Sequence, residues 1–216
     1  LYESYDQMIA TIHNLMQTQQ RHLRDRQRAE LRAMQAQINP HFIHNTLDTV
    51  NALALLGGQE EISDLVSELS ELLKYTMRFQ RQSVALEMEL RFVEKYARIQ
   101  KIRLDHRFSL ENRVGEEFLR YQVPRLSLQP LVENAIFYAS SDAPIRILLT
   151  ARQAGNSLEV RVSDNGTHCP AQRLNDYLSG AKMQVSGEGV GVRNVHERIR
   201  LQYGEGYGLR YEQNEQ

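Results

Sequence analysis

His41 is the first residue whose setting suggests chemistry, because it directly follows Asn39-Pro40 in the segment QINPHFIHNTL. At about 100° of rotation per helical residue, the apolar residues of this helix gather on one arc and His41 lies about 160° away, so its ring should face water. Pro40 removes a backbone donor and clashes with the preceding turn, which should kink the helix just before His41. An exposed imidazole beside a kink suits phosphoryl transfer, because its nitrogen can reach an incoming phosphate.

The neighbouring His44 leaves other interpretations open. It is predicted on the same polar face as His41 and is a rival acceptor, and either ring could instead be an ordinary surface side chain. A metal site is disfavoured, since the i, i+3 histidine pair lacks a carboxylate that would complete a catalytic zinc set.

Two polar residues in an apolar helix are the next candidates. The stretch from Leu126 to Ala139 is predicted to be a buried helix rich in leucine and valine, yet it includes Glu133 and Asn134. Polar groups among apolar neighbours need partners. A magnesium ion bridging phosphates would be one, and a helix cap or a core hydrogen bond would be another. The sequence has no GxxxxGK[ST] stretch, which excludes a P-loop.

Two glycine-containing segments follow. Asp164-Asn165-Gly166 closes the alternating segment LEVRVSDNG, and on its own it indicates a turn. The segment GEGVGVRNV, residues 187–195, opens a helix that is predicted over Val190 to Tyr203 and ended by Gly204. Glycines directly before a helix let backbone amides approach a phosphate at the positive end of the helix dipole.

The elements that must position these residues begin with long helical periods. A heptad-like seam starts at Tyr5, lapses, and restarts in another phase at Leu31, as in a coiled coil that changes its winding. Two helices separated by Gly57-Gly58 can pair as an antiparallel hairpin, and an amphipathic helix is predicted over Leu86 to Arg103. Two such hairpins would make a four-helix bundle in a homodimer.

After Asp105 the periods shorten, which predicts a domain boundary there. A first strand is expected at Phe108 to Leu110, and a hairpin is expected from Ile145–Ala151 and Leu158–Ser163, turned by Gly155-Asn156. A last short strand is expected at Leu209 to Glu212, and the polar stretch from Pro170 to Ser186 should be a loop that covers a bound nucleotide.

The charge balance excludes some classes of function. With 26 basic and 27 acidic residues, a net charge of −1, the chain has no basic excess for a nucleic-acid partner.

Cys169 is the single cysteine, so no disulfide or thiolate metal cage can form within one copy. No apolar stretch approaches the roughly 18 residues that span a bilayer. Because the chain opens at Leu1 in mid-helix, we expect it to be part of a longer protein whose sensor and membrane spans lie upstream.

Together these motifs resemble those of LytS/YesM-like sensor histidine kinases. QINPHFIHNTL is similar to the phosphoacceptor motif of that family and LEMELRFVEKYARIQKIR to its linking helix. LQPLVENA and DNG are similar to the N box and the first glycine box of the GHKL ATPase superfamily.

The resemblance implies a role for each candidate. His41 would be the phosphoacceptor, with Asn45 beside it in the catalytic set, and Asn134 would hold Mg²⁺, with Glu133 as a further candidate ligand. Asp164 would accept a hydrogen bond from the adenine amino group. The nucleotide-binding residues that the resemblance implies are Asn134, Asp164, Gly166, Gly189, Gly191 and Asn194.

Some positions depart from the family pattern. A second glycine usually follows Asp-Asn-Gly, where this chain has Thr167-His168-Cys169, and Lys-His usually follows the Asn-Ala step, where it has Phe137-Tyr138. Both changes could weaken phosphate or adenine binding. An aromatic residue usually stands in place of His44, and a Gly-Thr turn with a closing strand usually follows the point where this chain stops.

The sequence therefore predicts a helical dimerisation hairpin followed by a GHKL-type α/β sandwich. Residues 1–36 would be a signalling helix, 37–104 the dimerisation and phosphotransfer helices, and 105–216 the ATP-binding domain. The expected function is ATP- and Mg²⁺-dependent autophosphorylation of a histidine and phosphotransfer to a response-regulator aspartate, in the cytoplasmic portion of a bacterial inner-membrane protein. One alternative is a dimeric signalling scaffold with a degenerate nucleotide site. Another is a GHKL-type ATPase or serine kinase acting on a separate protein, which would leave the INPHF segment without a role.

Overall fold

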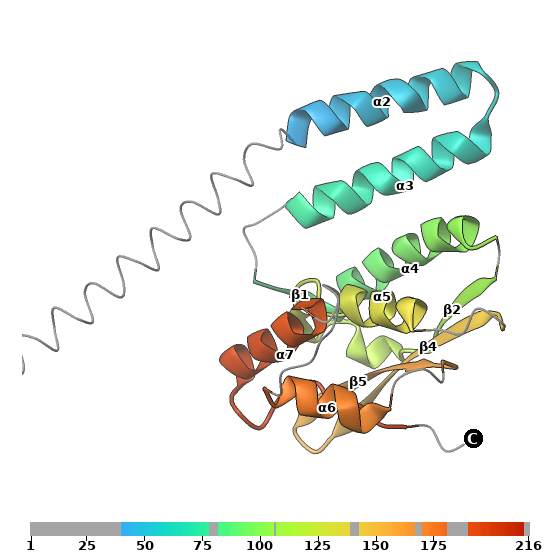
Figure 1. The fold of residues 1–216 in the computed structure, drawn as a ribbon. Coiled ribbons are helices and arrows are strands. Elements are labelled where there is room, and N and C mark those ends of the chain that lie inside the picture. Colours follow the sequence, from blue (N-terminus) through green and yellow to red (C-terminus); the bar gives the residue numbers. More distant parts are fainter. Residues whose placement is uncertain are drawn as a thin grey trace, which may run out of the picture. The chain divides into compact units, whose positions relative to one another are not determined.

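The structure is a computed structural model that describes residues 40–77, 82–105, 107–138, 143–166, 170–180 and 190–213 (Figure 1). The predicted signalling helix over residues 1–36 and the kink before His41 lie outside these ranges. The chain divides into two units after Val50, and each is described by itself.

Two helices separated by a glycine turn are present as the sequence predicts. They are α2 (Pro40–Leu56) and α3 (Glu60–Met77). In the turn, Gly58 has a φ of 65°, in the left-handed region that glycine adopts without strain, and the Gln59 amide donates to the Ala54 carbonyl at 2.8 Å. The Ser63 hydroxyl donates to Asn51 Oδ1 at 2.6 Å, which ties the last turns of α2 to the start of α3.

The predicted amphipathic helix is α4 (Leu86–Arg103), with the predicted bounds. Its buried residues Leu86, Leu90, Val93 and Ala97 recur at spacings of three and four, which places them on one face of the helix. Another side of α4 packs on α3, where Arg98 pairs with Glu68 at 2.7 Å and Lys95 pairs with Glu71.

A three-stranded sheet forms the second layer. Its strands are β2 (Phe108–Asn112), β4 (Ile145–Ala154) and β5 (Ser157–Asp164), in the order β2-β4-β5. β2 runs parallel to β4, and β4 and β5 form the predicted antiparallel hairpin, in which Gly155 has a φ of 61°. Ile147 and Leu149 alternate with more exposed residues along β4 and point into the core.

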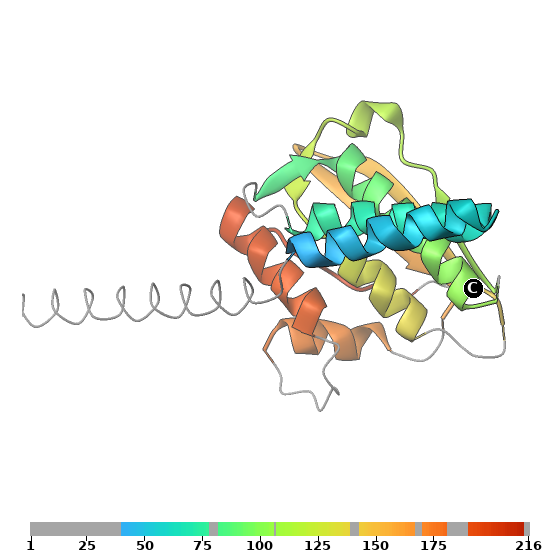
Figure 2. The same cartoon turned by 90° about the horizontal axis from the view of Figure 1, so that it is seen from above.

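Helices α4 and α5 (Gln129–Phe137) lie over one face of this sheet (Figures 1 and 2). The core between the layers combines residues that are almost fully buried, among them Leu86, Val93, Val132, Ile147 and Leu149. Helix α7 (Val190–Tyr203), with the predicted bounds, packs beside α5. The predicted order, helices followed by an α/β sandwich, is confirmed.

The remaining elements are short. β1 (Ser83–Ala85) pairs antiparallel with β3 (Gln122–Pro124), while η1 (Glu116–Phe118) and α6 (Ala171–Leu178) are single short helices. β1, β3 and α6 were not predicted from the sequence. Each is at most eight residues long and carries too few periods for a pattern to emerge.

Three predicted segments differ from the structure. The stretch from Pro170 to Ser186, which was predicted to be a loop, contains helix α6. Residues 209–212 are not a strand: the Leu209 amide donates to His196 Nδ1 at 3.0 Å and the Tyr211 amide to Asn175 Oδ1 at 2.9 Å, so helix side chains take the place of a neighbouring strand. Helix α5 begins at Gln129 rather than Leu126, because Leu126 has a φ of 54°, which no helix residue adopts.

Candidate functional site

His41 is exposed in the second position of α2, in agreement with the helical arithmetic. One turn further on, the Asn45 side-chain nitrogen lies 3.4 Å from His41 Nδ1. Which of the two groups donates depends on the imidazole tautomer and on the orientation of the amide. The helix thus pairs the ring with a neutral group that can both donate and accept a hydrogen bond.

His44 is half-buried, although it was predicted on the same polar face as His41. Three residues along a helix bring a side chain about 60° round the axis, here toward the apolar arc, which explains the lower exposure. The two histidines therefore differ in their access to solvent.

Asn134 lies in the second turn of α5, on the face that α7 approaches. Gly191 permits this approach: a Cβ added to Gly191 would lie 3.3 Å from Pro130 Cβ, so the first turns of the two helices are in direct contact. Pro130 and Asn134 are four residues apart and share a face of α5. The side chain of Asn134 is half-buried, and among the described residues no hydrogen bond to its amide is found. A half-buried amide with no bond to the described residues can bind an oxygen or nitrogen atom of a ligand.

Glu133 points away from that face. Its Oε1 accepts a hydrogen bond from Gln129 Nε2 at 2.7 Å, and it interacts with the Tyr96 hydroxyl of α4. Burial, reinforced by the Glu133 carboxylate, raises the pKa of Tyr96 to about 12, so the phenol stays a donor at neutral pH. Contacts within the protein thus account for a charged residue in this helix.

Asp164 is the last residue of β5, and one of its two carboxylate oxygens accepts a hydrogen bond. Its Oδ1 accepts the Gly166 amide at 2.8 Å, and no described group donates to its second carboxylate oxygen. Burial raises the pKa of Asp164, and the hydrogen bond from Gly166 partly offsets this. The carboxylate is a half-buried acceptor with capacity for one more donor.

Asn165 is a site residue that sequence reasoning missed. Its Oδ1 accepts the Arg146 amide at 2.8 Å and its Nδ2 donates to the Pro144 carbonyl at 3.0 Å, so its side chain prolongs the ladder between β4 and β5 beyond the end of β5. These bonds fix the backbone on which Asp164 sits. A turn motif read from sequence gives no sign of side-chain bonds to a segment about 20 residues away.

The phosphate side of the predicted site is only partly described. Gly187 and Gly189 lie outside the described residues, as do Thr167, His168 and Cys169. Of the predicted set, Gly191 lies half-buried in the first turn of α7, and Asn194, one turn on, is exposed.

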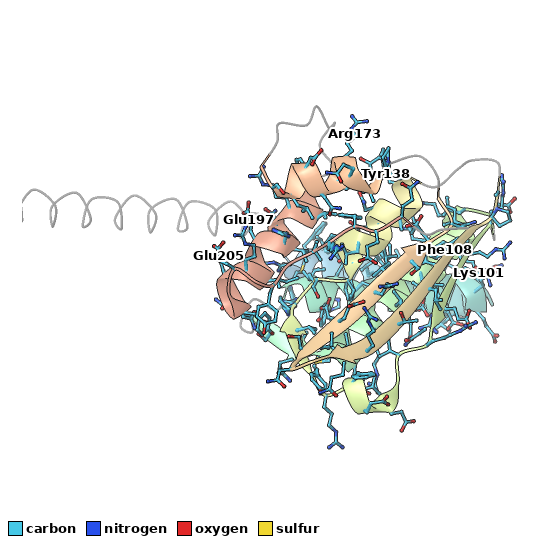
Figure 3. The ribbon with its side chains drawn as sticks, turned by 90° about the horizontal axis from the view of Figure 1, so that it is seen from below. Lys101, Phe108, Tyr138, Arg173, Glu197 and Glu205 are labelled. Carbon is cyan, nitrogen blue, oxygen red and sulfur yellow. The ribbon has the colours of Figure 1, made fainter. Side chains whose placement is uncertain are left out.

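At the other end of α5, two aromatic rings occupy the positions where the family pattern has Lys-His. Phe137 is 54% exposed, and its ring contacts Tyr138 edge to face with centroids 5.1 Å apart. Tyr138 is labelled in Figure 3, at the C-terminal end of α5. This end of the helix therefore presents an apolar surface instead of a cation.

Asn134 is the residue of the predicted set that fits a metal ion bound mainly by phosphates and water. In the part of the chain that the structure describes, no group of three or more His, Cys, Asp or Glu side chains is placed to hold an ion. Mg²⁺ commonly binds through one or two protein oxygens together with phosphates and water, which the Asn134 amide oxygen fits.

None of the helices that the structure describes combines the length and the apolar composition needed to cross a membrane.

Comparison with known proteins gives two family matches. Residues 29–108 match the family described as Histidine kinase, and residues 123–215 match the family described as Histidine kinase-, DNA gyrase B-, and HSP90-like ATPase. The second match covers the half of the chain that contains Asn134, Asp164 and Gly191.

Similar proteins carry related names. Sensor histidine kinase YesM of Bacillus subtilis (strain 168) is 37% identical over 183 residues, which are 84% of this chain and 30% of that protein. Sensor protein kinase HptS of Staphylococcus aureus (strain USA300) is 32% identical over 205 residues, 94% of this chain and 38% of that protein. The catalytic domain of histidine kinase ThkA is 17% identical, with a TM-score of 0.43 over 56% of this chain and 80% of that chain. The chain thus spans 30% to 38% of the length of the curated relatives it matches.

Proposed function

The chain belongs to the histidine kinase family, and from this premise we propose that it is the transmitter region of a sensor kinase: it moves the γ-phosphate of ATP to His41 and then to a response-regulator aspartate. The observation that carries the proposal is the exposed His41 ring with Asn45 beside it, in the same chain as an ATPase-type domain that carries Asn134 and Asp164. Among the described residues, no group bonds to the Asn134 amide or to the second carboxylate oxygen of Asp164.

His41 acts as the nucleophile through Nε2. With the Asn45 amide oxygen turned toward the ring, it accepts a hydrogen bond from the N–H group at His41 Nδ1, and this tautomer places the reactive lone pair on Nε2. Nε2 then forms a bond to the γ-phosphorus while the bond from that phosphorus to the bridging oxygen breaks, and ADP leaves with the electron pair. The Nδ1 proton stays with the ring in this step, because an amide cannot take it.

The ATPase-type domain holds the nucleotide. The open oxygen of Asp164 accepts from the adenine amino group, with Gly166 fixing the carboxylate through its amide. At the phosphate end, the start of α7 carries Gly191 and Asn194, and the helix dipole there favours negative charge. Gly189 is assigned to the phosphate site from the resemblance of its motif alone.

Asn134 is the residue that would hold Mg²⁺ through its amide oxygen. When bound, the ion neutralises charge on the phosphates during transfer. Glu133 is the second candidate ligand, but it would first have to leave Gln129. Asn134 needs no such exchange and is the stronger candidate.

The rival proposal, a scaffold with a degenerate nucleotide site, rests on the replaced Lys-His and glycine positions. The match of residues 123–215 to the ATPase family does not favour it. The further rival, a kinase or ATPase acting on a separate protein, leaves the match of residues 29–108 unexplained.

Calorimetric titration with ATP and Mg²⁺ tests the nucleotide site. We expect the wild-type chain to bind ATP with Mg²⁺. Asn134→Ala should weaken this binding by about tenfold or more, because the variant loses one polar contact to a charged group. Asn112→Ala, an exposed change in β2, is the control and should leave the affinity unaltered. No detectable binding by the wild-type chain would support the scaffold instead.

We also propose that the region works as a homodimer. Phe42, Leu53 and Leu56 are 68%, 64% and 85% exposed, and they fall within about 60° of arc on α2. Ile62 and Leu69, one heptad apart on α3, are exposed as well. A second copy that covers both stripes would complete a four-helix bundle.

The relatives named as sensor kinases are two to three times as long as this chain. We propose that this region is the cytoplasmic portion of a bacterial inner-membrane sensor, since its phosphodonor and its response regulator are both found in the cytoplasm.

A further inference from the structure

A buried carboxylate on α4 is the strongest feature that the proposed chemistry does not use. Glu89 is 0% exposed and accepts four hydrogen bonds. Its Oε1 accepts the Tyr75 hydroxyl and the Leu126 amide, each at 2.7 Å, and its Oε2 accepts the amides of Ser127 and Leu128 at 2.8 and 3.1 Å. Three consecutive amides are therefore held by one side chain.

Those amides belong to the residues that lead into α5. Leu126 has a φ of 54°, a left-handed conformation that costs about 1 kcal/mol or more in a residue other than glycine, so the bonds around it must hold it there. Leu128 comes directly before Gln129, the first residue of α5, and its carbonyl accepts the amides of Leu131 and Val132. The placement of this segment therefore sets where α5 begins.

The other side of the same segment is held by α7. Arg198 donates through Nη1 to the Arg125 carbonyl at 2.8 Å and through Nη2 to the Leu126 carbonyl at 2.9 Å. Glu89 thus binds the amides of the segment and Arg198 its carbonyls. Through these bonds one short piece of backbone fixes α5, which carries Asn134, and α7, which packs beside it.

Tyr75 brings a third helix into the same junction. It lies near the C-terminal end of α3, its ring contacts Phe92 with centroids 4.7 Å apart, and the Arg125 guanidinium carbon lies 4.6 Å from its ring centroid. Burial, together with the Glu89 carboxylate, raises the pKa of Tyr75, so its hydroxyl remains a donor at physiological pH. Along the chain, the turn over residues 57–59 connects α3 to α2, the helix that carries His41.

Stability alone does not explain why this buried position carries a carboxylate instead of an apolar side chain. Replacing buried ionic groups by apolar residues of similar volume is often neutral or stabilising, whereas a carboxylate with four donors specifies one geometry. We propose that Glu89 is a positioning residue for the nucleotide site, acting on Asn134 through the start of α5, and that the Tyr75 hydroxyl makes the site sensitive to the position of α3.

This inference rests on the proposed nucleotide site, and it is tested with two variants of the full chain. In the wild type, the backbone amides of residues 126–128 donate to the two carboxylate oxygens of Glu89. Glu89→Gln replaces one of these oxygens with an NH₂ group, which cannot accept a hydrogen bond. Tyr75→Phe removes the hydroxyl group and keeps the ring contacts. We expect the ATP dissociation constant to rise by about tenfold in Glu89→Gln and by about threefold in Tyr75→Phe, measured well below each melting temperature. Tyr207→Phe, which removes an exposed hydroxyl that contacts Ser157, is the matched control and should leave the constant unchanged.

A double-mutant cycle separates positioning from general loosening. If Glu89 acts through Asn134, the effect of Glu89→Gln on ATP affinity should largely disappear when Asn134 is already alanine. ATP affinity that is unchanged in both single variants, or effects that are fully additive with Asn134→Ala, would overturn the inference. If Glu89→Gln does not fold, the same cycle with Tyr75→Phe decides. A wild-type chain that binds no ATP would instead contradict the proposed nucleotide site itself.

Discussion

At the scale of single residues, the site combines groups that the sequence reveals with groups that it conceals. His41 stands out because it follows Asn39-Pro40 on the exposed side of a predicted helix. Asn134 stands out as a polar residue in an apolar helix, and Asp164 as the acidic end of an alternating strand. Glu89 also left a signal, since it falls between Leu86 and Leu90 on the buried face of α4. Its four donors could not be predicted, because three of them are amides of residues 126–128, almost 40 positions away.

Asp164 permits a prediction about pH. Its folded pKa is raised above its ordinary value of 3.8 by burial, so its ionised form is the costly one in the folded protein. The folded state is favoured by this group below pH 3.8, and that contribution is lost as the pH rises through the raised pKa. Asparagine keeps the acceptor for Gly166 without the charge, so Asp164→Asn should melt at the same or a higher temperature at neutral pH.

Thermal melting from pH 7 downward checks this sign: the gap between variant and wild type should shrink as the pH falls toward 3.8. ATP affinity should fall by about tenfold in the same variant, since the site loses its charged acceptor. A variant that melts well below the wild type at neutral pH would show that the charge stabilises the fold, against the direction given above.

At the scale of elements, the bounds of long periodic helices and strands were predicted well. Short elements, and segments whose structure depends on contacts with distant parts of the chain, were not. α4 and α7 have their predicted bounds, and the β4–β5 hairpin turns where Gly155-Asn156 indicated. The predicted strand over residues 209–212 was wrong, because its alternating pattern is satisfied by contacts with His196 and Asn175. Whether an alternating segment pairs with a strand or with helix side chains is decided by tertiary neighbours, which the local pattern does not contain.

The contact between α5 and α7 gives a prediction at this scale. Gly191→Val should destabilise the chain by about 1–3 kcal/mol, because branched carbons at this position would push against Pro130 in a well-packed contact. Urea unfolding measures the change, and ATP affinity should fall with it. Gly206→Ala, where an added Cβ meets nothing within 4 Å, is the control. Equal stabilities for Gly191→Val and wild type would mean that the two helices do not need the close approach.

At the scale of the whole molecule, the exposed apolar stripes of α2 and α3 predict the assembly. Leu53→Glu places a charge in the stripe that a second copy is proposed to cover, and should shift the chain from dimer to monomer. Light scattering after size exclusion measures the mass. Leu201→Glu is a matched control, since Leu201 is 88% exposed on α7, outside both stripes, and the dimer should survive it. A wild-type chain with the mass of a single copy at micromolar concentration would rule out the proposed dimer.

The central claim is that His41 receives the phosphate, and one labelling experiment tests it most directly. The chain is incubated with γ-labelled ATP and Mg²⁺, and the acid-labile label on the protein is compared among wild type, His41→Gln and His44→Gln. The account predicts label on the wild type and on His44→Gln and none on His41→Gln, because His41 is exposed and His44 is half-buried. Label that persists in His41→Gln, or that is lost only in His44→Gln, would contradict it.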